Sequence, residues 1–322
     1  MTRDTVLEAL RRSGDAYVSG AELARGLALS RTAVWKAIEQ LRSEGYGIDS
    51  VPRLGYRLRP DSDVLSAEGI ARYLRHRELR LQVFSSVSST NTVLKTLAAE
   101  GEAAGLALVA EAQTAGRGRM GRSFYSPADS GVYLSLLLRP ALPAAEATRL
   151  TACAAVAVCE TLEALSGRET QIKWVNDIFM DGRKVCGILT EAGLDCESGM
   201  THYVVIGIGV NVRAPEGDFP EELRGVAGAA FDAGRVPELR CRIAAGILDR
   251  LLDFAADPGS PAVFEGYRRR SLVLGREIRI LGPGREPEPA VAEALGEDFS
   301  LLARLPDGSL RRLSSGEVSV RL

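Results

Sequence analysis

The chain has 322 residues, of which 46% are hydrophobic and 25% are charged, and these proportions exclude an intrinsically disordered protein. Its length exceeds that of a usual single domain, so we expect several domains and a substantial hydrophobic core. The formal net charge is −2, and the charges are unevenly distributed along the chain.

The cysteine and histidine content argues against a disulfide framework and against a metal site formed by these residues. The two histidines, His76 and His202, do not have the spacing of metal ligands. Because no apolar signal segment or membrane-length apolar run is present, we expect a cytoplasmic protein that does not bind membranes. The five cysteines form an odd set without a Cys-x-x-Cys pair, which argues against a disulfide framework and structural zinc: Cys153, Cys159, Cys186, Cys196 and Cys241.

Residues 1–60 predict a small helical domain. A first helix is expected over residues 5–12, where the apolar residues fall on one face. Ser19 begins a capping box for a short second helix, which a glycine ends. Ser30 is expected to cap a longer helix over residues 31–44, whose apolar stripe faces inward.

A β-ribbon, formed by residues 48–51 and 55–58, is expected after these helices and completes a winged helix-turn-helix. Residues 1–60 carry ten Lys and Arg against seven Asp and Glu, a balance of +3, while the remainder carries −5. A local positive excess suits a surface that faces DNA phosphates, although a helix-turn-helix can also be only a packing unit. The candidate DNA-binding residues begin the longer helix and occupy its outer face: Ser30, Arg31, Thr32, Trp35 and Lys36.

Residues 61–270 alternate helical and strand patterns, which indicates a domain of mixed α/β structure. A helix is expected over residues 92–100, directly after the polar triplet Ser89-Thr90-Asn91, and helix N-termini favour anions. A buried strand is expected over residues 203–211, and the Pro- and Gly-rich segment 212–220 that follows it is predicted to be a loop.

The segment from Gly116 to Arg122 packs three glycines and three arginines into seven positions, directly after a buried strand at 105–111. Glycines let backbone N–H groups approach a ligand, and arginines bind carboxylate or phosphate. The glycine spacing also matches a dinucleotide-binding fingerprint, but a loop follows where that motif needs a helix. The segment therefore predicts an anion-binding loop, and a solvated turn is the alternative.

A second polar cluster lies between residues 171 and 191. Alternating apolar residues predict a strand over 172–178, Asp181-Gly182 predicts a hairpin turn, and a second strand is expected over 185–191. We expect four polar side chains to converge on one cavity from these two strands, although an ordinary hairpin with charged outward faces is the alternative. The four are Lys173, Asn176, Asp177 and Lys184.

Residues 271–322 predict a small β-barrel of short strands. Turns are expected at Gly282 to Gly284 and at Pro306 to Gly308. The strands are expected at residues 277–281, 291–295, 300–305, 310–313 and 318–322.

Five segments, in this order, resemble the motifs of the biotin–protein ligases. Each motif is weak alone, but the ordered series is specific to that family. Two positions depart from the family pattern: Val175 stands where proline is frequent, and Met120 where the repressor-type members have arginine. The five segments are Ser88 to Asn91, Glu111 to Arg122, Lys173 to Asp177, Arg183 to Leu189 and Ile206 to Asn211.

The resemblance implies an α+β multidomain fold: a winged helix-turn-helix (1–60), a central α/β ligase domain with a mixed sheet (61–270) and an SH3-like β-barrel (271–322). It implies an enzyme that uses ATP and Mg²⁺ to form biotinyl-5′-AMP and transfers biotin to a lysine of biotin carboxyl carrier protein. It further implies a biotin-responsive repressor that binds operator DNA and forms a homodimer with the adenylate bound. A transcription regulator without turnover and a lipoate or octanoyl transferase remain alternatives.

The resemblance also implies roles for residues of the motifs. The catalytic residues would be Lys184 and Arg119, and Asp177 would bind Mg²⁺ or orient Lys173. The biotin-binding residues would be Ser89, Thr90, Asn91, Gln113, Gly116, Arg117, Gly118, Arg119 and Lys184. The ATP-binding residues would be Arg119, Arg122, Lys173, Asn176, Asp177 and Asn211.

Overall fold

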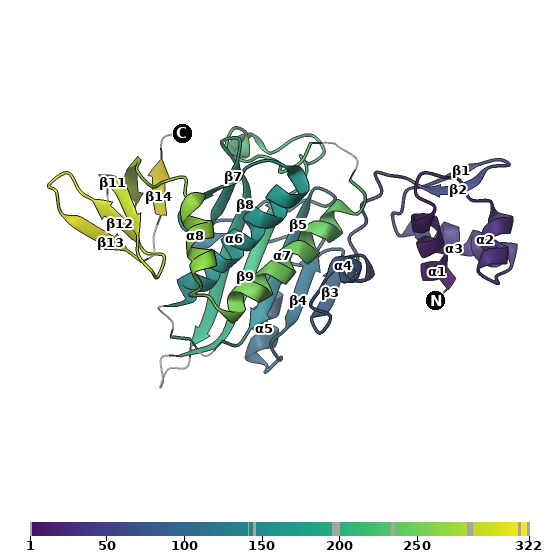
Figure 1. Ribbon diagram of the computed structural model, residues 1–322, viewed down its shortest axis with the longest axis horizontal. Coiled ribbons are helices and arrows are strands. Elements are labelled where there is room, and N and C mark those ends of the chain that lie inside the picture. Colours follow the sequence, from purple (N-terminus) through teal and green to yellow (C-terminus); the bar gives the residue numbers. More distant parts are fainter. Residues whose placement is uncertain are drawn as a thin grey trace. The chain divides into compact units, whose positions relative to one another are not determined.

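The computed structural model describes residues 2–140, 142–143, 146–194, 200–232, 236–281, 286–314 and 317–320. Cys196, the predicted turn at Gly282 to Gly284, and residues 321–322 of the last predicted strand lie outside the described residues. The chain forms two compact units, one of residues 1–70 and 233–242 and the other of residues 71–232 and 243–322 (Figure 1).

The N-terminal unit begins with three helices and a β-ribbon. They are α1 (Thr2–Arg12), α2 (Gly20–Gly26), α3 (Arg31–Ser43) and the antiparallel strands β1 (Ile48–Val51) and β2 (Gly55–Leu58). The Oγ atoms of Ser19 and Ser30 accept hydrogen bonds of 3.1 Å from backbone N–H groups, which caps α2 and α3. The predicted helix-turn-helix is confirmed, and the ribbon follows it in the position of a wing.

The core of this domain lies between α1 and α3. Val6 and Leu10 on α1, and Ile38 and Leu41 on α3, are fully buried in it. They recur at three- and four-residue spacing, so each helix turns one apolar face inward. The other face of α3 is left exposed, and the predicted DNA-binding residues lie there.

A seven-stranded sheet forms the centre of the second unit. Its order is β3-β4-β5-β9-β8-β7-β6, with β3 parallel to β4 and all other neighbours antiparallel, so the predicted mixed sheet is confirmed. The strands are β3 (Arg80–Phe84), β4 (Leu106–Ala110), β5 (Gly131–Leu138), β6 (Gln171–Lys173), β7 (Asp177–Met180), β8 (Arg183–Leu194) and β9 (Thr201–Asn211).

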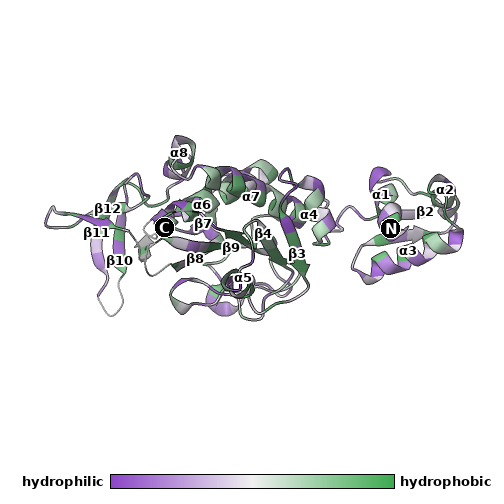
Figure 2. Ribbon diagram, turned by 90° about the horizontal axis from the view of Figure 1, so that it is seen from below, coloured by the Kyte–Doolittle hydropathy of each residue, from purple (hydrophilic) through white to green (hydrophobic). Residues whose placement is uncertain are grey.

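Helices cover both faces of this sheet. α5 lies on one face, while α6 and α8 lie on the other face together with α7 (Figures 1 and 2). The central strands β4 and β9 are strongly hydrophobic in Figure 2, as expected for strands buried on both faces. Among the described helices, none has the length and apolar character of a membrane span. The helices are α4 (Ala67–Tyr73), α5 (Thr90–Ala99), α6 (Ala147–Ser166), α7 (Leu239–Ala256) and α8 (Pro261–Arg269).

The strand predicted over residues 172–178 is wrong in one respect, because it is interrupted between β6 and β7. The polar and aromatic groups of the interruption bond to other elements instead of continuing one strand. Asn176 exchanges hydrogen bonds with the backbone of Ile188, with Nδ2 to O at 2.8 Å. The Trp174 indole N–H donates to the carbonyl of Phe299 at 2.9 Å. The predicted polar cluster is therefore spread over β6, a turn, β7 and β8.

The C-terminal residues form a five-stranded antiparallel sheet of order β13-β12-β11-β10-β14. Within the described residues β13 and β14 are the edges of this sheet, so closure into a barrel stays a prediction. The strands are β10 (Glu277–Leu281), β11 (Glu288–Leu295), β12 (Leu301–Arg304), β13 (Leu310–Leu313) and β14 (Glu317–Val320), close to the predicted positions.

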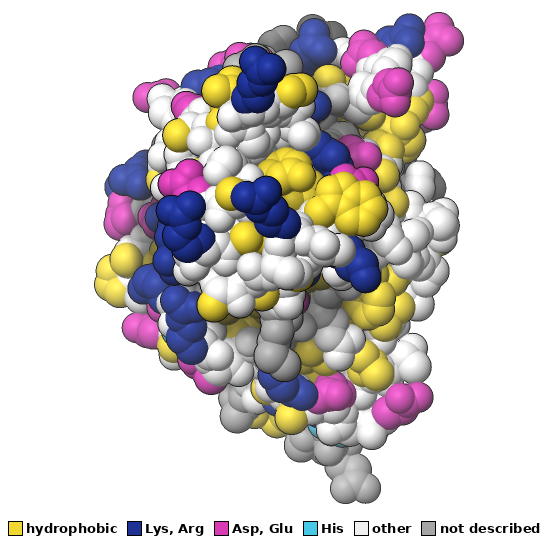
Figure 3. All heavy atoms as spheres, turned by 90° about the vertical axis from the view of Figure 1, so that its right-hand side faces the viewer, with side chains coloured by type: hydrophobic (Ala, Val, Ile, Leu, Met, Phe, Trp, Pro, Cys, Tyr) yellow, Lys and Arg dark blue, Asp and Glu magenta, His cyan; other side chains and the backbone are white. Residues whose placement is uncertain are grey.

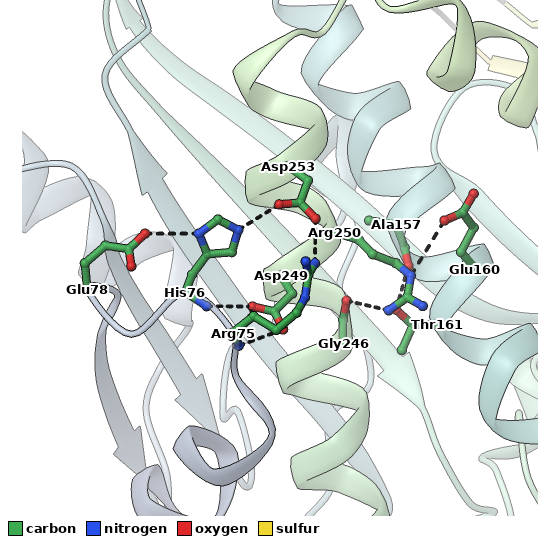
Figure 4. Close-up of polar contacts among 10 residues, drawn as sticks. All are labelled: Arg75, His76, Glu78, Ala157, Glu160, Thr161, Gly246, Asp249, Arg250 and Asp253. Atoms are coloured by element: carbon green, nitrogen blue, oxygen red, sulfur yellow. Dashed lines mark hydrogen bonds and ion pairs between the residues drawn. The ribbon is translucent and has the colours of Figure 1, made fainter.

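A polar cluster anchors the segment between α4 and β3 on helix α7 (Figure 4). Buried Asp249 accepts hydrogen bonds from the backbone N–H groups of Arg75 and His76, at 2.9 and 3.1 Å. The His76 ring lies between two carboxylates, with Nε2 2.8 Å from Asp253 and Nδ1 3.0 Å from Glu78. The hydrogen bonds to Asp253 and Glu78 raise the pKa of His76 above its ordinary value of 6.5.

This cluster predicts a pH-dependent contribution to stability. Because the pKa of His76 is raised by folding, the charged ring stabilises the fold fully below pH 6.5, and the contribution is lost as the pH rises through the folded-state pKa. We expect His76→Gln to lower the Tm by about 2 °C near pH 6, and this difference to shrink as the pH rises through the raised pKa of His76. Thermal unfolding at a series of pH values checks this, and a difference that grows with pH would contradict it.

Candidate functional site

A cavity of about 130 Å³ lies where α5, the glycine/arginine loop and strands β6 to β9 meet. Two predicted residues, Gly116 and Asn211, instead line a neighbouring cavity of about 570 Å³. Lys184, Arg122 and Gln113 line both cavities. The other predicted ligand residues that line the first cavity are Ser89, Thr90, Asn91, Arg117, Gly118, Arg119, Lys173, Asn176 and Asp177.

Two glycines of β9 let side chains approach the sheet beside this cavity. A Cβ atom on Gly207 would lie 2.0 Å from Oδ1 of Asn91, and one on Gly209 would lie 2.5 Å from the ring of Phe124. Neither distance is possible between real atoms, so both positions require glycine. The Gly-x-Gly pattern of the strand therefore makes room for the groups that form one wall of the cavity.

Part of the cavity lining consists of neutral hydrogen-bonding groups. The Oε1 atom of Gln113 accepts from the backbone N–H of Thr90 at 2.9 Å and from its hydroxyl at 3.2 Å. The Nε2 atom of Gln113 donates one hydrogen to Ser126 Oγ at 3.0 Å, and no described residue provides an acceptor for the other. The side chain of Gln113 can therefore donate a hydrogen bond to a ligand carbonyl in the cavity.

The same cavity is also lined by cations. Lys184 Nζ lies 2.7 Å from Oδ1 of Asp177, and Arg119 Nη1 donates to Oδ1 of Asn176 at 3.0 Å. The side chains of Arg122 and Lys173 line the same space. Several cations with a single carboxylate among them favour an anionic ligand, and an apolar wall strengthens each charge interaction.

Backbone hydrogen bonds hold Lys184 in place at the start of β8. Its N–H donates to the carbonyl of Val226 at 2.8 Å, and its carbonyl accepts from Gly228 at 2.9 Å. Asn211, at the end of β9, donates from Nδ2 to the same Gly228 at 3.2 Å. The segment after β9 therefore packs beside Lys184, and Phe219 and Pro220 of the predicted loop line the neighbouring cavity.

Comparison with known proteins identifies the family. The family model described as "Biotin/lipoate A/B protein ligase family" matches residues 83–211, and an "HTH domain" model matches residues 2–57. The bifunctional ligase/repressor BirA of Bacillus subtilis (strain 168) is 41% identical over 227 residues, which cover 70% of this chain and 69% of that protein. The chain belongs to the biotin/lipoate A/B protein ligase family.

Two further relatives support the biotin branch of this family. The biotin--[acetyl-CoA-carboxylase] ligase of Mycobacterium tuberculosis is 32% identical over 248 residues, which cover 74% of this chain and 88% of that protein. The structure of the Aquifex aeolicus biotin protein ligase in complex with biotin and ATP matches with a TM-score of 0.59 and 28% identity. That match covers 75% of this chain and 98% of the other.

Two polar residues beside the ligase site were missed by sequence reasoning. Ser135 on β5 is fully buried, and its Oγ lies 2.7 Å from Thr90 Oγ1 and 2.6 Å from Asn91 Oδ1. Glu191 on β8 accepts from Asn91 at 3.0 Å and from Lys95 at 2.7 Å. A signal for Ser135 does exist, because it is a lone polar residue within the apolar run of β5.

The predicted DNA-binding residues gather on the exposed face of α3. Arg31, Thr32 and Lys36 are exposed, and 54% of the surface of Trp35 is accessible. Ser30 is also exposed, but its hydroxyl oxygen caps the helix. Figure 3, which faces the side on which α2, α3 and the β-ribbon lie, shows Lys and Arg side chains around apolar ones. Exposed cations beside an exposed indole suit contact with DNA phosphates and base edges.

Proposed function

We propose that this chain is an ATP-dependent biotin–protein ligase that forms biotinyl-5′-AMP and transfers biotin to a lysine of a carrier protein. The observation that carries the proposal is that one cavity is lined both by neutral hydrogen-bonding groups, such as Thr90 and Gln113, and by cations, such as Lys184 and Arg119. Biotin carries a matching group for each kind, a ureido group and a carboxylate. Membership of the biotin ligase family supports the assignment.

In the proposed first step, a biotin carboxylate oxygen attacks the α-phosphorus of ATP, the bond from that phosphorus to the bridging oxygen breaks, and pyrophosphate leaves. Two anions must approach each other for this, and the charges of Lys184 and Arg119 offset their repulsion. Both side chains would also stabilise the negative charge that develops on the phosphoryl oxygens. Arg122, Lys173, Asn176 and Asn211 would hold the nucleotide between the two cavities.

In the second step, the amine of the carrier lysine attacks the carbonyl carbon of biotinyl-5′-AMP. The bond from this carbon to the phosphate oxygen breaks, AMP leaves with the electron pair, and the amine loses its proton to solvent. The mixed anhydride must survive until the carrier arrives, so we propose that the loop from Gly116 to Arg122 covers it and excludes water. Ser89, Thr90, Asn91, Gln113, Gly116, Arg117 and Gly118 form the proposed biotin site.

Mg²⁺ fits the site as part of the ATP complex. The described residues contain no cluster of three or more His, Cys, Asp or Glu side chains that would hold a metal ion. A Mg²⁺ ion, however, often needs only one or two carboxylates when substrate phosphates complete its ligands. Asp177 is the carboxylate that lines the cavity, and its pairing with Lys184 would weaken as the ion binds. The ion would neutralise phosphate charge.

Purified protein with biotin and ATP tests the ligase assignment. We expect micromolar or tighter biotin binding by calorimetry, pyrophosphate release that requires biotin, and negligible binding of lipoate, which lacks the ureido group. Biotin binding without pyrophosphate release would indicate the regulator without turnover. Affinity for lipoate comparable to that for biotin would indicate a lipoate or octanoyl transferase.

We propose further that the protein represses transcription from biotin-responsive operator DNA as a homodimer. One domain with a balance of +3 makes few phosphate contacts, so two domains on a palindromic site are expected. Binding of the adenylate phosphate by the glycine/arginine loop would favour the dimer and couple enzyme state to operator affinity.

Lys36 is one of the exposed cations of α3. Lys36→Ala should weaken binding to the chain's own biotin-gene promoter by about tenfold and reduce the salt dependence of binding by about one phosphate contact. Titrations at several salt concentrations, with and without biotin and ATP, provide the measurement. If these ligands leave operator affinity unchanged, the helix-turn-helix is a packing unit.

We propose the division into domains 1–60, 61–270 and 271–322, and an SH3-like barrel for the last of them, because its five short antiparallel strands include a bulge between Ala292 and Ala294 that bends β11. We also propose that the protein works in the cytoplasm, where ATP and carrier proteins are both available.

A further inference from the structure

The side-chain amide of Asn91 has a single possible orientation. Its Nδ2 donates to the carbonyl of Leu189 at 3.1 Å and to Oε2 of Glu191 at 3.0 Å. A carbonyl oxygen and a carboxylate can only accept, so both hydrogens of Nδ2 point toward them. Only 3% of the surface of Asn91 is exposed, so its Oδ1 faces inward, toward Ser135.

Glu191 remains a carboxylate under ordinary conditions. Burial raises the pKa of its carboxyl, but hydrogen bonds from Lys95 and Asn91 and the charges of Lys95 and Arg117 lower the pKa more, so that it lies below the ordinary value. The ammonium of Lys95 is 2.7 Å from Oε1, and Arg117 is 3.9 Å from the same atom. The negative charge therefore fixes the orientation of Asn91.

The orientation of Asn91 decides where the single proton of Ser135 lies. The Oγ of Ser135 is 2.6 Å from Oδ1 of Asn91, which can only accept, so Ser135 donates its proton there. The contact of 2.7 Å between Ser135 Oγ and Thr90 Oγ1 then needs a proton from Thr90. Ser135 is fully buried, so bulk solvent does not reach its hydroxyl.

The proton of Thr90 is thus committed to the protein. Besides Ser135, the only other acceptor that the described residues place near it is Oε1 of Gln113 at 3.2 Å, which the bond from Nε2 to Ser126 holds in this orientation. In either case the Thr90 hydroxyl presents a lone pair, and not a proton, to the cavity that it lines. A ligand must bring an N–H or O–H donor to this point.

We propose that Ser135 is a positioning residue for ligand specificity: anchored through Asn91 to Glu191, it makes the Thr90 hydroxyl an acceptor and so selects ligands with an N–H group at that position. The inference rests on the proposed function, in which the N–H belongs to the ureido ring of biotin. The carbonyl of the same ring would accept a hydrogen bond from the second Nε2 hydrogen of Gln113, the one that is not donated to Ser126. A dithiolane ring, as in lipoate, offers neither partner.

A double-mutant cycle on biotin affinity tests this role. Ser135→Ala should weaken biotin binding by about tenfold, and Thr90→Val should weaken it by about the same factor or more. Because Ser135 acts through Thr90, the double variant should bind biotin no more weakly than Thr90→Val alone. Independent losses that multiply in the double variant would show a merely structural role and overturn the inference.

A matched control variant and a second ligand make the double-mutant cycle more specific for this role of Ser135. Ser130 is also a buried serine, and its Oγ donates to the carbonyl of Pro127 at 3.2 Å, outside this network. Ser130→Ala should leave biotin affinity within about twofold of the wild type. In the double variant with Thr90→Val, this small change in affinity should multiply with the loss caused by Thr90→Val. A biotin analogue methylated on a ureido nitrogen should bind the wild type much more weakly than biotin does. In Ser135→Ala, the ratio of the affinity for biotin to the affinity for this analogue should be about tenfold smaller.

Measurements of biotin binding and of pyrophosphate release distinguish failure of this inference from failure of the proposed function. We expect Ser135→Ala to raise the KM for biotin while kcat for pyrophosphate release changes by less than about threefold, because the cations that line the cavity are unchanged. Wild-type protein that binds no biotin would overturn the proposed function and the inference with it. Biotin binding with unchanged affinity in Ser135→Ala overturns the inference alone.

Discussion

Replacement of Lys184 by Ala is expected to slow biotin-dependent pyrophosphate release by about 10²–10³-fold while the protein remains folded. Lys184 lines both cavities, as Arg122 does, and its Nζ lies 2.7 Å from Oδ1 of Asp177; a carboxylate and a triphosphate meet at this point in the proposed reaction. Without the ammonium, the transition state loses charge stabilisation that water cannot replace in an enclosed site. Single-turnover pyrophosphate release at saturating biotin and ATP measures the effect.

Lys95→Ala is the matched control for this variant. Lys95 also lies 2.7 Å from a carboxylate, that of Glu191, and is exposed to a similar degree, but it is not among the residues that line the cavity. We expect its loss to change the rate of pyrophosphate release by only a few fold. Wild-type rates in Lys184→Ala, or equal losses in both variants, would show that Lys184 has no special role.

Replacement of Gly207 by Ala should reduce biotin affinity by at least about 100-fold and destabilise the fold by about 1–3 kcal/mol. The added Cβ would lie 2.0 Å from Oδ1 of Asn91, so the amide must leave its position. Since Asn91 sits in the first turn of α5 and its amide bonds to Ser135, this displacement disturbs the neutral hydrogen-bonding groups that line the cavity. Calorimetry with biotin and denaturant unfolding measure the two effects.

Gly26→Ala provides the control for a glycine that no contact requires. A Cβ at Gly26 meets nothing within 4 Å, and the residue ends helix α2 in the N-terminal unit. This variant should bind biotin like the wild type and unfold at a similar denaturant concentration. If Gly207→Ala retains wild-type affinity, the close approach of Asn91 to β9 is not needed for the ligand site.

The helix boundaries of the N-terminal domain could be predicted because they depend on neighbouring residues. Ser19 and Ser30 cap helices with their own side chains, and both bonds join residues three positions apart. The apolar spacing on α3 likewise identifies its buried face without knowledge of its partner. Local chemistry was sufficient for this part of the fold.

The strand predicted over residues 172–178 shows the limit of such local reasoning. Alternation of apolar residues predicted one strand, but the strand is interrupted at residues 174–176. Within this interruption, Asn176 and Trp174 bond to partners 12 and 125 positions away. Hydrogen bonds to distant backbone groups outweighed the local preference. No pattern within the segment itself contains this information.

The sequence by itself determined which chemical groups this protein brings to its site: the arginines of the glycine-rich loop, Lys184, and the Thr90-Asn91 pair at the start of a helix. Residue type and spacing are sufficient for that, because charge and hydrogen-bonding capacity belong to the side chains themselves. Only the tertiary structure decided how these groups are oriented. Asn91 meets Glu191 across 100 positions and Ser135 across 44, through contacts that exist only once β5, β8 and β9 have paired.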